Sequence, residues 1–90
     1  MLKLYYRPSC PFCVRVLRAN ESIKAPLELV DISVDPDARA ELIEKGGKSQ
    51  VPYLEDTKRQ EGLYESLDII DYLISHYGGP TTEVSSNDIL

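Results

Sequence analysis

The 90-residue chain is long enough for one domain with a single core, and its contents of 42% hydrophobic and 28% charged residues are ordinary for a globular protein. Its net charge of −5 disfavours nucleic-acid binding, which needs clustered basic residues, and no apolar run approaches the roughly 18 residues of a membrane span. The N-terminus lacks the apolar stretch of a secretory signal, so we expect a cytoplasmic protein without nucleic-acid or membrane partners.

The first quarter of the chain predicts a strand followed by a helix. Residues 2–6 form an aliphatic and aromatic run of strand character, and Pro8 stops further pairing because it lacks an N–H. A helix should begin near Cys10 or Pro11, since proline suits the first helical position, and it should end before Pro26. Its expected inner face carries Cys13, Val16, Leu17 and Asn20.

The next segment predicts a second strand and a second helix. Residues 27–32 alternate apolar and polar side chains for much of their length, which indicates a strand parallel to the first one. Asp35 suits the N-cap of the second helix and Pro36 its first position. Gly46 and Gly47 should end this helix.

The remaining chain predicts a hairpin and a third helix. Residues 51–54 and 60–64 indicate two short strands, joined closely enough for antiparallel pairing. Ser66 can cap a helix that runs to about Tyr77, and residues 78–90 are expected to form a flexible tail. One side of this helix should be apolar, with Leu67, Ile70, Ile74 and Tyr77 on it and Ile69 and Leu73 adjoining.

The two cysteines, Cys10 and Cys13, lie where the first strand gives way to the first helix, which is a recognised redox arrangement. A thiolate is the nucleophile of disulfide exchange, and the unpaired N–H groups and dipole of a helix N-terminus stabilise an anion. Cys13 should be more buried and less ionised, because it lies one turn into the helix. We therefore predict that Cys10 is the attacking thiolate and Cys13 the resolving thiol.

Positive charge gathers around these thiols. Residues 1–24 carry five cations against one carboxylate, a balance of +4, and the rest of the chain carries −9. Arg7 is close enough in sequence to add a positive field at Cys10, which favours thiolates and anionic ligands. For Arg18 and Lys24, simple solvation of one helix face is an equally good interpretation.

Other interpretations of the cysteines are less favoured. A disulfide between Cys10 and Cys13 would close too short a loop to stabilise much. A zinc site would need further ligands, and the one histidine, His76, falls in the distant third helix, so we expect no metal. Two chance core cysteines remain an alternative, and His76 is expected to be a partly exposed residue near a helix C-terminus.

Residues 5–13 (Tyr-Tyr-Arg-Pro-Ser-Cys-Pro-Phe-Cys), together with Gln50-Val51-Pro52, resemble a glutaredoxin of the thioredoxin fold. The resemblance covers residues 1–77 and implies one α/β domain in the order β-α-β-α-β-β-α, with a four-stranded mixed sheet flanked by helices. It also implies that the peptide bond before Pro52 is cis and that the Val51 backbone pairs with bound glutathione. A plain proline at a strand start is the alternative for Pro52.

The resemblance further implies a set of glutathione contacts. Arg7 and Lys48 fall where glutaredoxins carry basic residues, and Gln50 replaces their usual threonine. Glu65 and Ser66 are instead similar to the Glu-Ser turn of glutathione transferase N-terminal domains, which binds the γ-glutamyl end; a surface charge and an N-cap are the plain alternatives. The expected contacts are Arg7, Pro11, Phe12, Lys48, Gln50, Val51, Pro52, Glu65 and Ser66.

These residues predict a monomeric, glutathione-dependent thiol–disulfide oxidoreductase, a dithiol glutaredoxin that acts on disulfide-containing or glutathionylated proteins. Three alternatives stay open: a redoxin served by thioredoxin reductase, of the kind that supplies ribonucleotide reductase; a truncated glutathione-transferase-like domain; and an iron–sulfur-binding glutaredoxin. The candidate glutathione contacts disfavour the first. We expect no helical C-terminal domain, which disfavours the second, and Pro11 disfavours the third, because cluster-binding members usually lack that proline.

Overall fold

The computed structural model describes residues 2–77, and the prediction of a tail over residues 78–90 lies outside this part. No helix in the described range is long and apolar enough to cross a membrane. The elements follow the predicted order: β1 (Leu2–Tyr6), α1 (Pro11–Ile23), β2 (Leu27–Asp31), α2 (Pro36–Gly46), β3 (Tyr53–Asp56), β4 (Glu61–Leu63) and α3 (Ser66–Tyr77).

The four strands form one mixed sheet in the order β2-β1-β3-β4. Strand β1 runs parallel to β2, with Leu4 opposite Leu29, and antiparallel to β3, with Leu4 opposite Leu54. Strands β3 and β4 pair as an antiparallel hairpin. The predicted α/β fold with a mixed four-stranded sheet is confirmed. Because β1 is a central strand, the turn after it brings Cys10 to the middle of one end of the sheet.

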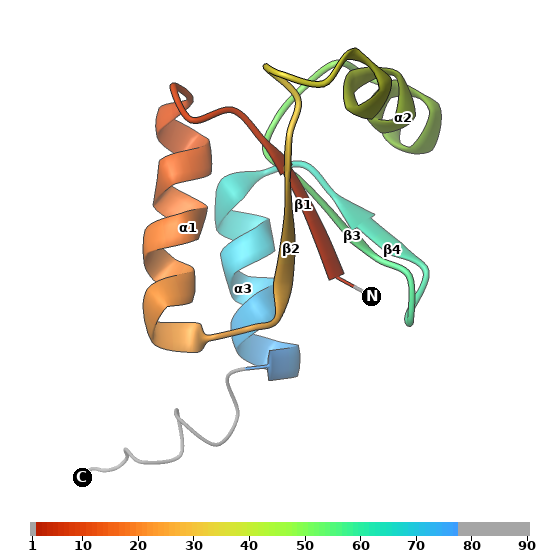
Figure 1. The fold of residues 1–90 in the computed structure, drawn as a ribbon. Helices are drawn as coiled ribbons and strands as arrows, with labels where there is room; N and C mark the ends of the chain where they lie inside the picture. The colour runs from red at the N-terminus through yellow and green to blue at the C-terminus, as the bar shows by residue number, and fades with distance from the viewer. Residues whose placement is uncertain (1, 78–90) are drawn as a thin grey trace, which may run out of the picture.

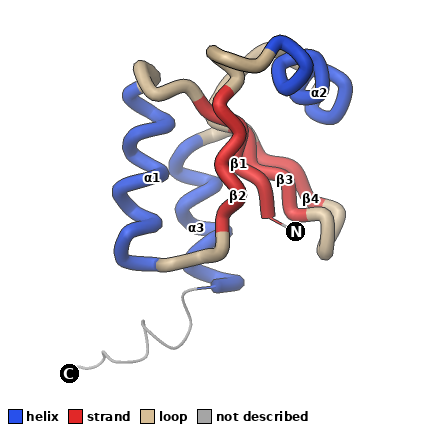
Figure 2. Tube along the Cα trace, viewed as in Figure 1, coloured by secondary structure: helices blue, strands red, loops and turns tan. Residues whose placement is uncertain are grey.

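Helices cover both faces of the sheet (Figure 1, Figure 2). Helices α1 and α3 pack side by side on one face and begin at the same end of the domain, while α2 lies on the other face (Figure 1). Successive side chains of a strand point to opposite faces, so β1 supplies Leu4 to one core and Tyr5 to the other. The α1/α3 core contains Leu2, Leu4, Val16, Ala25, Leu54, Ile69 and Leu73, and the α2 core contains Tyr5, Ile32, Ala38, Leu42 and Tyr53.

The predicted inner face of α1 is largely correct. Cys13 and Val16 are fully buried, and Leu17 packs against the α1/α3 core. The Asn20 amide accepts from the Ala25 N–H at 2.9 Å and donates to the Ala25 carbonyl at 3.1 Å. This pair of hydrogen bonds fixes the chain where it leaves the helix for β2.

The start and end of α2 follow from local signals. The Asp35 carboxylate accepts from the N–H groups of Asp37 and Ala38 at 3.0 and 3.4 Å, as an N-cap does. At the other end, Gly47 adopts a left-handed conformation with φ 88°, and its N–H donates to the Ile43 carbonyl. The predicted limits of this helix are confirmed.

The start of β3 and the buried side of α3 differ from the prediction. Strand β3 begins at Tyr53 rather than at residue 51, because Pro52 has no N–H to offer the ladder. In helix α3, Ile70 and Tyr77 pack against the core as predicted, but Leu67 is 61% exposed and Ile74 is 39% exposed, and the fully buried residues are Ile69 and Leu73. The apolar residues of α3 form one broad stripe, and packing against α1 and the sheet buries the edge with Ile69 and Leu73.

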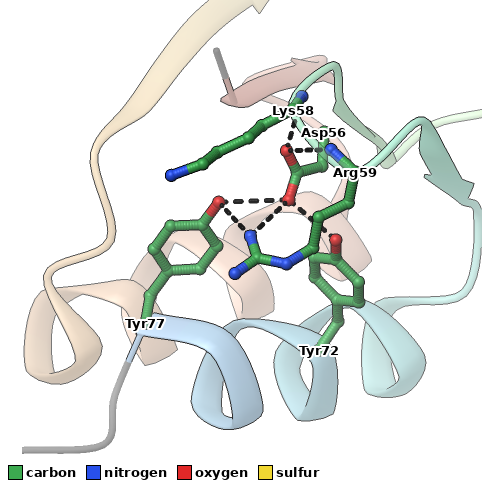
Figure 3. Close-up of polar contacts among 5 residues, drawn as sticks. All are labelled: Asp56, Lys58, Arg59, Tyr72 and Tyr77. Carbon is green, nitrogen blue, oxygen red and sulfur yellow. Dashed lines mark hydrogen bonds and ion pairs between the residues drawn. The ribbon is translucent and has the colours of Figure 1, made fainter.

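A buried carboxylate ties the β3–β4 hairpin to the C-terminal half of α3 (Figure 3). Asp56 is 1% exposed, and it accepts from the Tyr72 hydroxyl at 2.7 Å, the Tyr77 hydroxyl at 3.1 Å and the Arg59 guanidinium at 3.1 Å. The backbone N–H of Lys58 donates to it as well, at 3.1 Å. Burial raises the pKa of Asp56, but the hydrogen bonds from the tyrosines and Arg59 outweigh burial and lower this pKa to about 2. We call Asp56, Arg59, Tyr72 and Tyr77 the Asp56 cluster.

Candidate active site

Cys10 is the N-cap of α1, with an extended backbone at φ −85° and ψ 117°. Its Sγ accepts a hydrogen bond from the backbone N–H of Cys13 at 3.3 Å, and its carbonyl accepts from the Val14 N–H at 3.0 Å. The Cys10 N–H donates to the Arg7 carbonyl at 3.1 Å, which closes the turn between β1 and α1. The partly exposed sulfur therefore lies at the positive end of the α1 dipole.

Cys13 differs sharply from Cys10. It is fully buried, and burial, followed by its hydrogen bond with Cys10, raises the pKa of Cys13 to about 12. Both cysteines are free thiols. The expected burial of Cys13 is confirmed, and its raised pKa agrees with a weakly ionised thiol, while the roles of the two thiols in exchange stay predictions.

The loop that precedes β3 runs beside Cys10. The Val51–Pro52 peptide bond is cis, as expected, and Pro52 is buried. The Cys10 thiol donates to the Val51 carbonyl over 3.9 Å, a long contact that joins residues 41 positions apart. The fold thus brings the two motifs of the sequence together.

A cleft of about 590 Å³ adjoins this contact. The first turns of α1 form one side, the loop before β3 forms a second, and the start of α3 forms the third. The cleft is lined by Phe12, Arg15, Gln50, Val51, Pro52, Tyr64, Glu65, Ser66, Leu67 and Asp68. Six predicted contacts therefore meet at one cavity: Phe12, Gln50, Val51, Pro52, Glu65 and Ser66.

Three predicted contacts lie outside the lining of this cleft. Arg7 is exposed in the turn before Cys10, and Pro11 is exposed at the first position of α1. The Lys48 ammonium lies beside Tyr64, 4.8 Å from the centre of its ring. Neither Arg7 nor Lys48 therefore forms part of the walls of the cleft.

Four lining residues were not among the predicted contacts: Arg15, Tyr64, Leu67 and Asp68. Arg15 follows Phe12 by three residues on α1, and its guanidinium carbon lies 5.6 Å from the Phe12 ring centre, so helical spacing could have found it. Tyr64 and Asp68 flank the predicted Glu-Ser pair. Leu67 could not be predicted as a lining residue, because the apolar period of α3 indicates that it faces the core.

Glu65 and Ser66 stand at the N-terminal end of α3. The helix begins at Ser66, so the predicted cap is one residue late: the Glu65 carbonyl accepts the N–H of Ile69 at 2.8 Å. Ser66 is 7% exposed, while Glu65 is open to solvent. An anion bound here would meet the unpaired N–H groups of the first turn of α3.

The cleft carries opposite charges on its two helical sides, with Arg15 on α1 and Glu65 and Asp68 on α3. Within residues 2–77, no group of three or more histidine, cysteine, aspartate or glutamate side chains could hold a metal ion. His76 is exposed in the last turn of α3, with its ring centre 4.3 Å from that of Tyr72. It lies at the opposite end of α3 from the cleft.

Residues 4–81 match the family described as glutathione S-transferase, N-terminal domain. No curated protein sequence matches the chain. Among solved structures, glutathione S-transferase unclassified 2 from Bombyx mori has a TM-score of 0.73 and 26% identity, over 86% of this chain and 36% of that one. A delta-class glutathione transferase from Nilaparvata lugens has a TM-score of 0.69 and 31% identity, over 87% of this chain and 37% of that one.

A glutathione transferase homologue from Sulfitobacter, solved with bound glutathione, has a TM-score of 0.69 over 98% of this chain and 41% of that one. Its identity of 24% supports the fold alone. The chain spans between 36% and 41% of the length of these three proteins. The thioredoxin-like fold is thereby confirmed, in the form that it takes in transferase N-terminal domains.

Proposed function

The chain belongs to the family of glutathione S-transferase N-terminal domains, and from this premise we propose that it binds glutathione beside Cys10 and catalyses thiol–disulfide exchange. Its substrates would be disulfide-containing or glutathionylated proteins. The observation that supports this proposal is the contrast between two neighbouring thiols. Cys10 is an accessible N-cap residue in contact with Val51 at the cleft, and Cys13 is a buried thiol behind it.

The two ends of glutathione suit the charges around the cleft. The Glu65 carboxylate would pair with the ammonium of the γ-glutamyl group, and the Ser66 hydroxyl with the first N–H groups of α3 would receive its carboxylate. The cysteinyl backbone of glutathione would lie along Val51. Its sulfur would then be directed towards Cys10, which contacts the Val51 carbonyl.

The glycine carboxylate of glutathione needs a cation at the other end of the cleft. Arg15 lines the cleft itself, whereas Arg7 and Lys48 do not. All three side chains are exposed and able to move towards a bound anion. We therefore add Arg15 to the two cations expected from the sequence.

In the first step, the Cys10 thiolate attacks the glutathione sulfur of a protein–glutathione disulfide. A Cys10–glutathione disulfide forms, and the protein leaves as a thiolate that takes up a proton. The thiolate of a second glutathione then attacks the glutathione sulfur held on Cys10, which releases glutathione disulfide and restores the Cys10 thiolate. Overall, the protein–glutathione disulfide is reduced to a protein thiol, and free glutathione is oxidised to glutathione disulfide.

Cys13 offers a second route, in which its thiolate attacks the Cys10 sulfur and expels glutathione. Burial is the main cause that raises the pKa of Cys13, and it persists when Cys10 carries glutathione, so the Cys13 thiolate should be scarce and this route slow. We therefore propose that removal of glutathione from proteins needs Cys10 alone. Reduction of a disulfide within a protein would engage both thiols.

Conjugation of glutathione to an electrophile is a second candidate, favoured by the family match. Conjugation needs the glutathione thiolate to stay free for the electrophile. A cysteine facing that sulfur would instead form a disulfide with it under oxidising conditions. For this reason we rank disulfide exchange ahead of conjugation.

The deciding assay follows NADPH oxidation during reduction of the mixed disulfide of glutathione and 2-mercaptoethanol. One arm contains glutathione and glutathione reductase, and the other contains thioredoxin reductase. We expect turnover in the first arm, lost in Cys10→Ser and retained in Cys13→Ser. Turnover only with thioredoxin reductase would overturn the proposal, and conjugation of 1-chloro-2,4-dinitrobenzene without disulfide reduction would establish the transferase.

A further inference from the structure

One side chain, Tyr64, connects two walls of the cleft. We propose that Tyr64 is a positioning residue that holds the loop over residues 48–51 in the conformation that binds glutathione, an inference that rests on the function proposed above. The loop contains Lys48, Gln50 and Val51, three of the expected glutathione contacts. Tyr64 directly precedes Glu65, which begins the wall formed by α3.

The Tyr64 hydroxyl makes two hydrogen bonds with the backbone of Lys48. It accepts from the Lys48 N–H at 3.2 Å and donates to the Lys48 carbonyl at 3.0 Å. Two hydrogen bonds to one residue fix its direction as well as its position. Because Lys48 comes two residues before Gln50, these hydrogen bonds set the path of the chain into the cleft.

The ring of Tyr64 is also fixed by contacts with neighbouring side chains. It packs against Tyr53 of β3 with ring centres 4.6 Å apart and planes inclined by 43°, and the Lys48 ammonium lies 4.8 Å from its centre. The ring also lines the cleft. Through these contacts, Tyr64 fixes the loop before β3 and the start of α3 relative to the sheet.

The end of α2 is shaped to admit this side chain. A methyl group at position 46 would overlap the Tyr64 hydroxyl, so Gly46 is needed for space. The left-handed backbone belongs to Gly47, where a side chain would meet no atom. The two adjacent glycines are therefore needed for different reasons. Gly46 leaves space for the Tyr64 hydroxyl, and Gly47 adopts the left-handed conformation that ends the helix.

Such an anchor matters because the loop is otherwise open. Lys48, Ser49 and Gln50 are all exposed, and the other contacts described for this loop are weak: an exposed hydrogen bond of 3.0 Å from the Arg39 side chain to the Ser49 hydroxyl and the long contact of 3.9 Å from the Cys10 thiol to the Val51 carbonyl. Ordering an exposed loop when a ligand binds costs affinity, and a loop ordered beforehand avoids that cost.

The test compares two substitutions of the same kind. Tyr64→Phe removes the hydroxyl and keeps the ring, and we expect it to raise the KM for glutathione about tenfold, which corresponds to about 1.4 kcal/mol. The kcat and the rate of Cys10 alkylation should stay within about twofold, because Cys10 is held by α1 and the turn before it, and its contact with Val51 of this loop is long at 3.9 Å. Tyr72→Phe removes a hydroxyl bonded to Asp56, so it should lower the Tm and leave the KM unchanged.

Gly46→Ala provides an independent perturbation, since it should displace the hydroxyl and raise the KM in the same way. An unchanged KM in Tyr64→Phe, or an equal rise in Tyr72→Phe, would overturn the inference. Amide hydrogen exchange of the free protein separates this failure from failure of the proposed function. Even if the wild type showed no dependence on glutathione, faster exchange at Gln50 and Val51 in Tyr64→Phe would support the anchor, and unchanged exchange would refute it.

Discussion

Removing the charge of Asp56 gives the sharpest test of what holds the hairpin to α3. Asp56→Asn keeps the size of the side chain, but an amide has one oxygen where the carboxylate has two. In the wild type those oxygens receive the Tyr72 and Tyr77 hydroxyls, the Arg59 guanidinium and backbone N–H groups. The variant would leave some of these buried donors without an acceptor.

The magnitude follows from the pKa of Asp56, which falls from its ordinary value of 3.8 to about 2 in the folded chain. At about 1.4 kcal/mol for each pH unit, the difference contributes about 2.5 kcal/mol to the free energy of unfolding. Because the pKa is lower in the folded state, this stability is present above about pH 4 and is lost as the pH falls towards 2. For a domain of this size, it corresponds to about 10–20 °C in Tm.

The assay is urea unfolding followed by circular dichroism between pH 7 and pH 2. We expect Asp56→Asn to be about 2.5 kcal/mol less stable than the wild type at pH 7, with the gap narrowing between about pH 4 and pH 2. Asp71→Asn, which changes an exposed carboxylate of α3, should follow the wild type throughout. A gap of constant size at every pH would refute the reasoning, because the lost stability would then not come from the carboxylate.

Three further outcomes follow from the site and the core. Iodoacetamide at pH 8 should modify Cys10 and spare Cys13, whose pKa is raised to about 12, and tandem mass spectrometry showing equal labelling would contradict this. In urea titrations, Leu73→Ala should lower the free energy of unfolding by about 2–5 kcal/mol, because Leu73 is fully buried. Ile74→Ala should lower it far less, because Ile74 is 39% exposed, and similar losses in the two variants would contradict the observed orientation of α3. Glu65→Ala should raise the KM for glutathione about tenfold without slowing Cys10 alkylation, and an unchanged KM would return Glu65 to a surface charge.

The order of elements could be predicted because strong local signals mark their limits. Pro11 and Pro36 each start a helix, Asp35 caps one, and Gly47 ends one with a positive φ. Each signal acts through the backbone of its own residue or of close neighbours, so it is visible in the sequence. The same holds for the asymmetry between the thiols, which depends on their places along α1.

The orientation of α3 and the full lining of the cleft could not be predicted in this way. The apolar side chains of α3 form one broad stripe, with Leu67 and Ile74 at one edge and Ile69 and Leu73 at the other, so the helical period alone does not say which edge faces inwards. Contacts with α1 and the sheet make the choice. The same long-range packing brings Tyr64 against the loop before β3.

The family match covers residues 4–81, but the signal in the sequence that pointed towards this family occupies a small part of the chain. The Cys-Pro-Phe-Cys motif and the cis proline are compatible with glutaredoxins as well as with the family that matches. Glu65 and Ser66 departed from the glutaredoxin pattern in the direction of transferase N-terminal domains. The residues that fit the first resemblance least were therefore the most informative about the family.

The division of the interior into two cores has a consequence for helix α2. Ala38 and Leu42 are the residues that α2 buries, so α2 should detach from the sheet at a lower free energy than global unfolding requires. Its last residue, Gly46, lies against Tyr64, so detachment would loosen the loop that we expect to hold glutathione. If a ligand binds only when this loop is in place, and is present at a concentration of 100 times its Kd, it would raise the free energy of this opening by about 2.7 kcal/mol. Helix α2 contributes no side chain to the cleft lining, yet the rate of its amide hydrogen exchange would then depend on whether a ligand occupies the cleft.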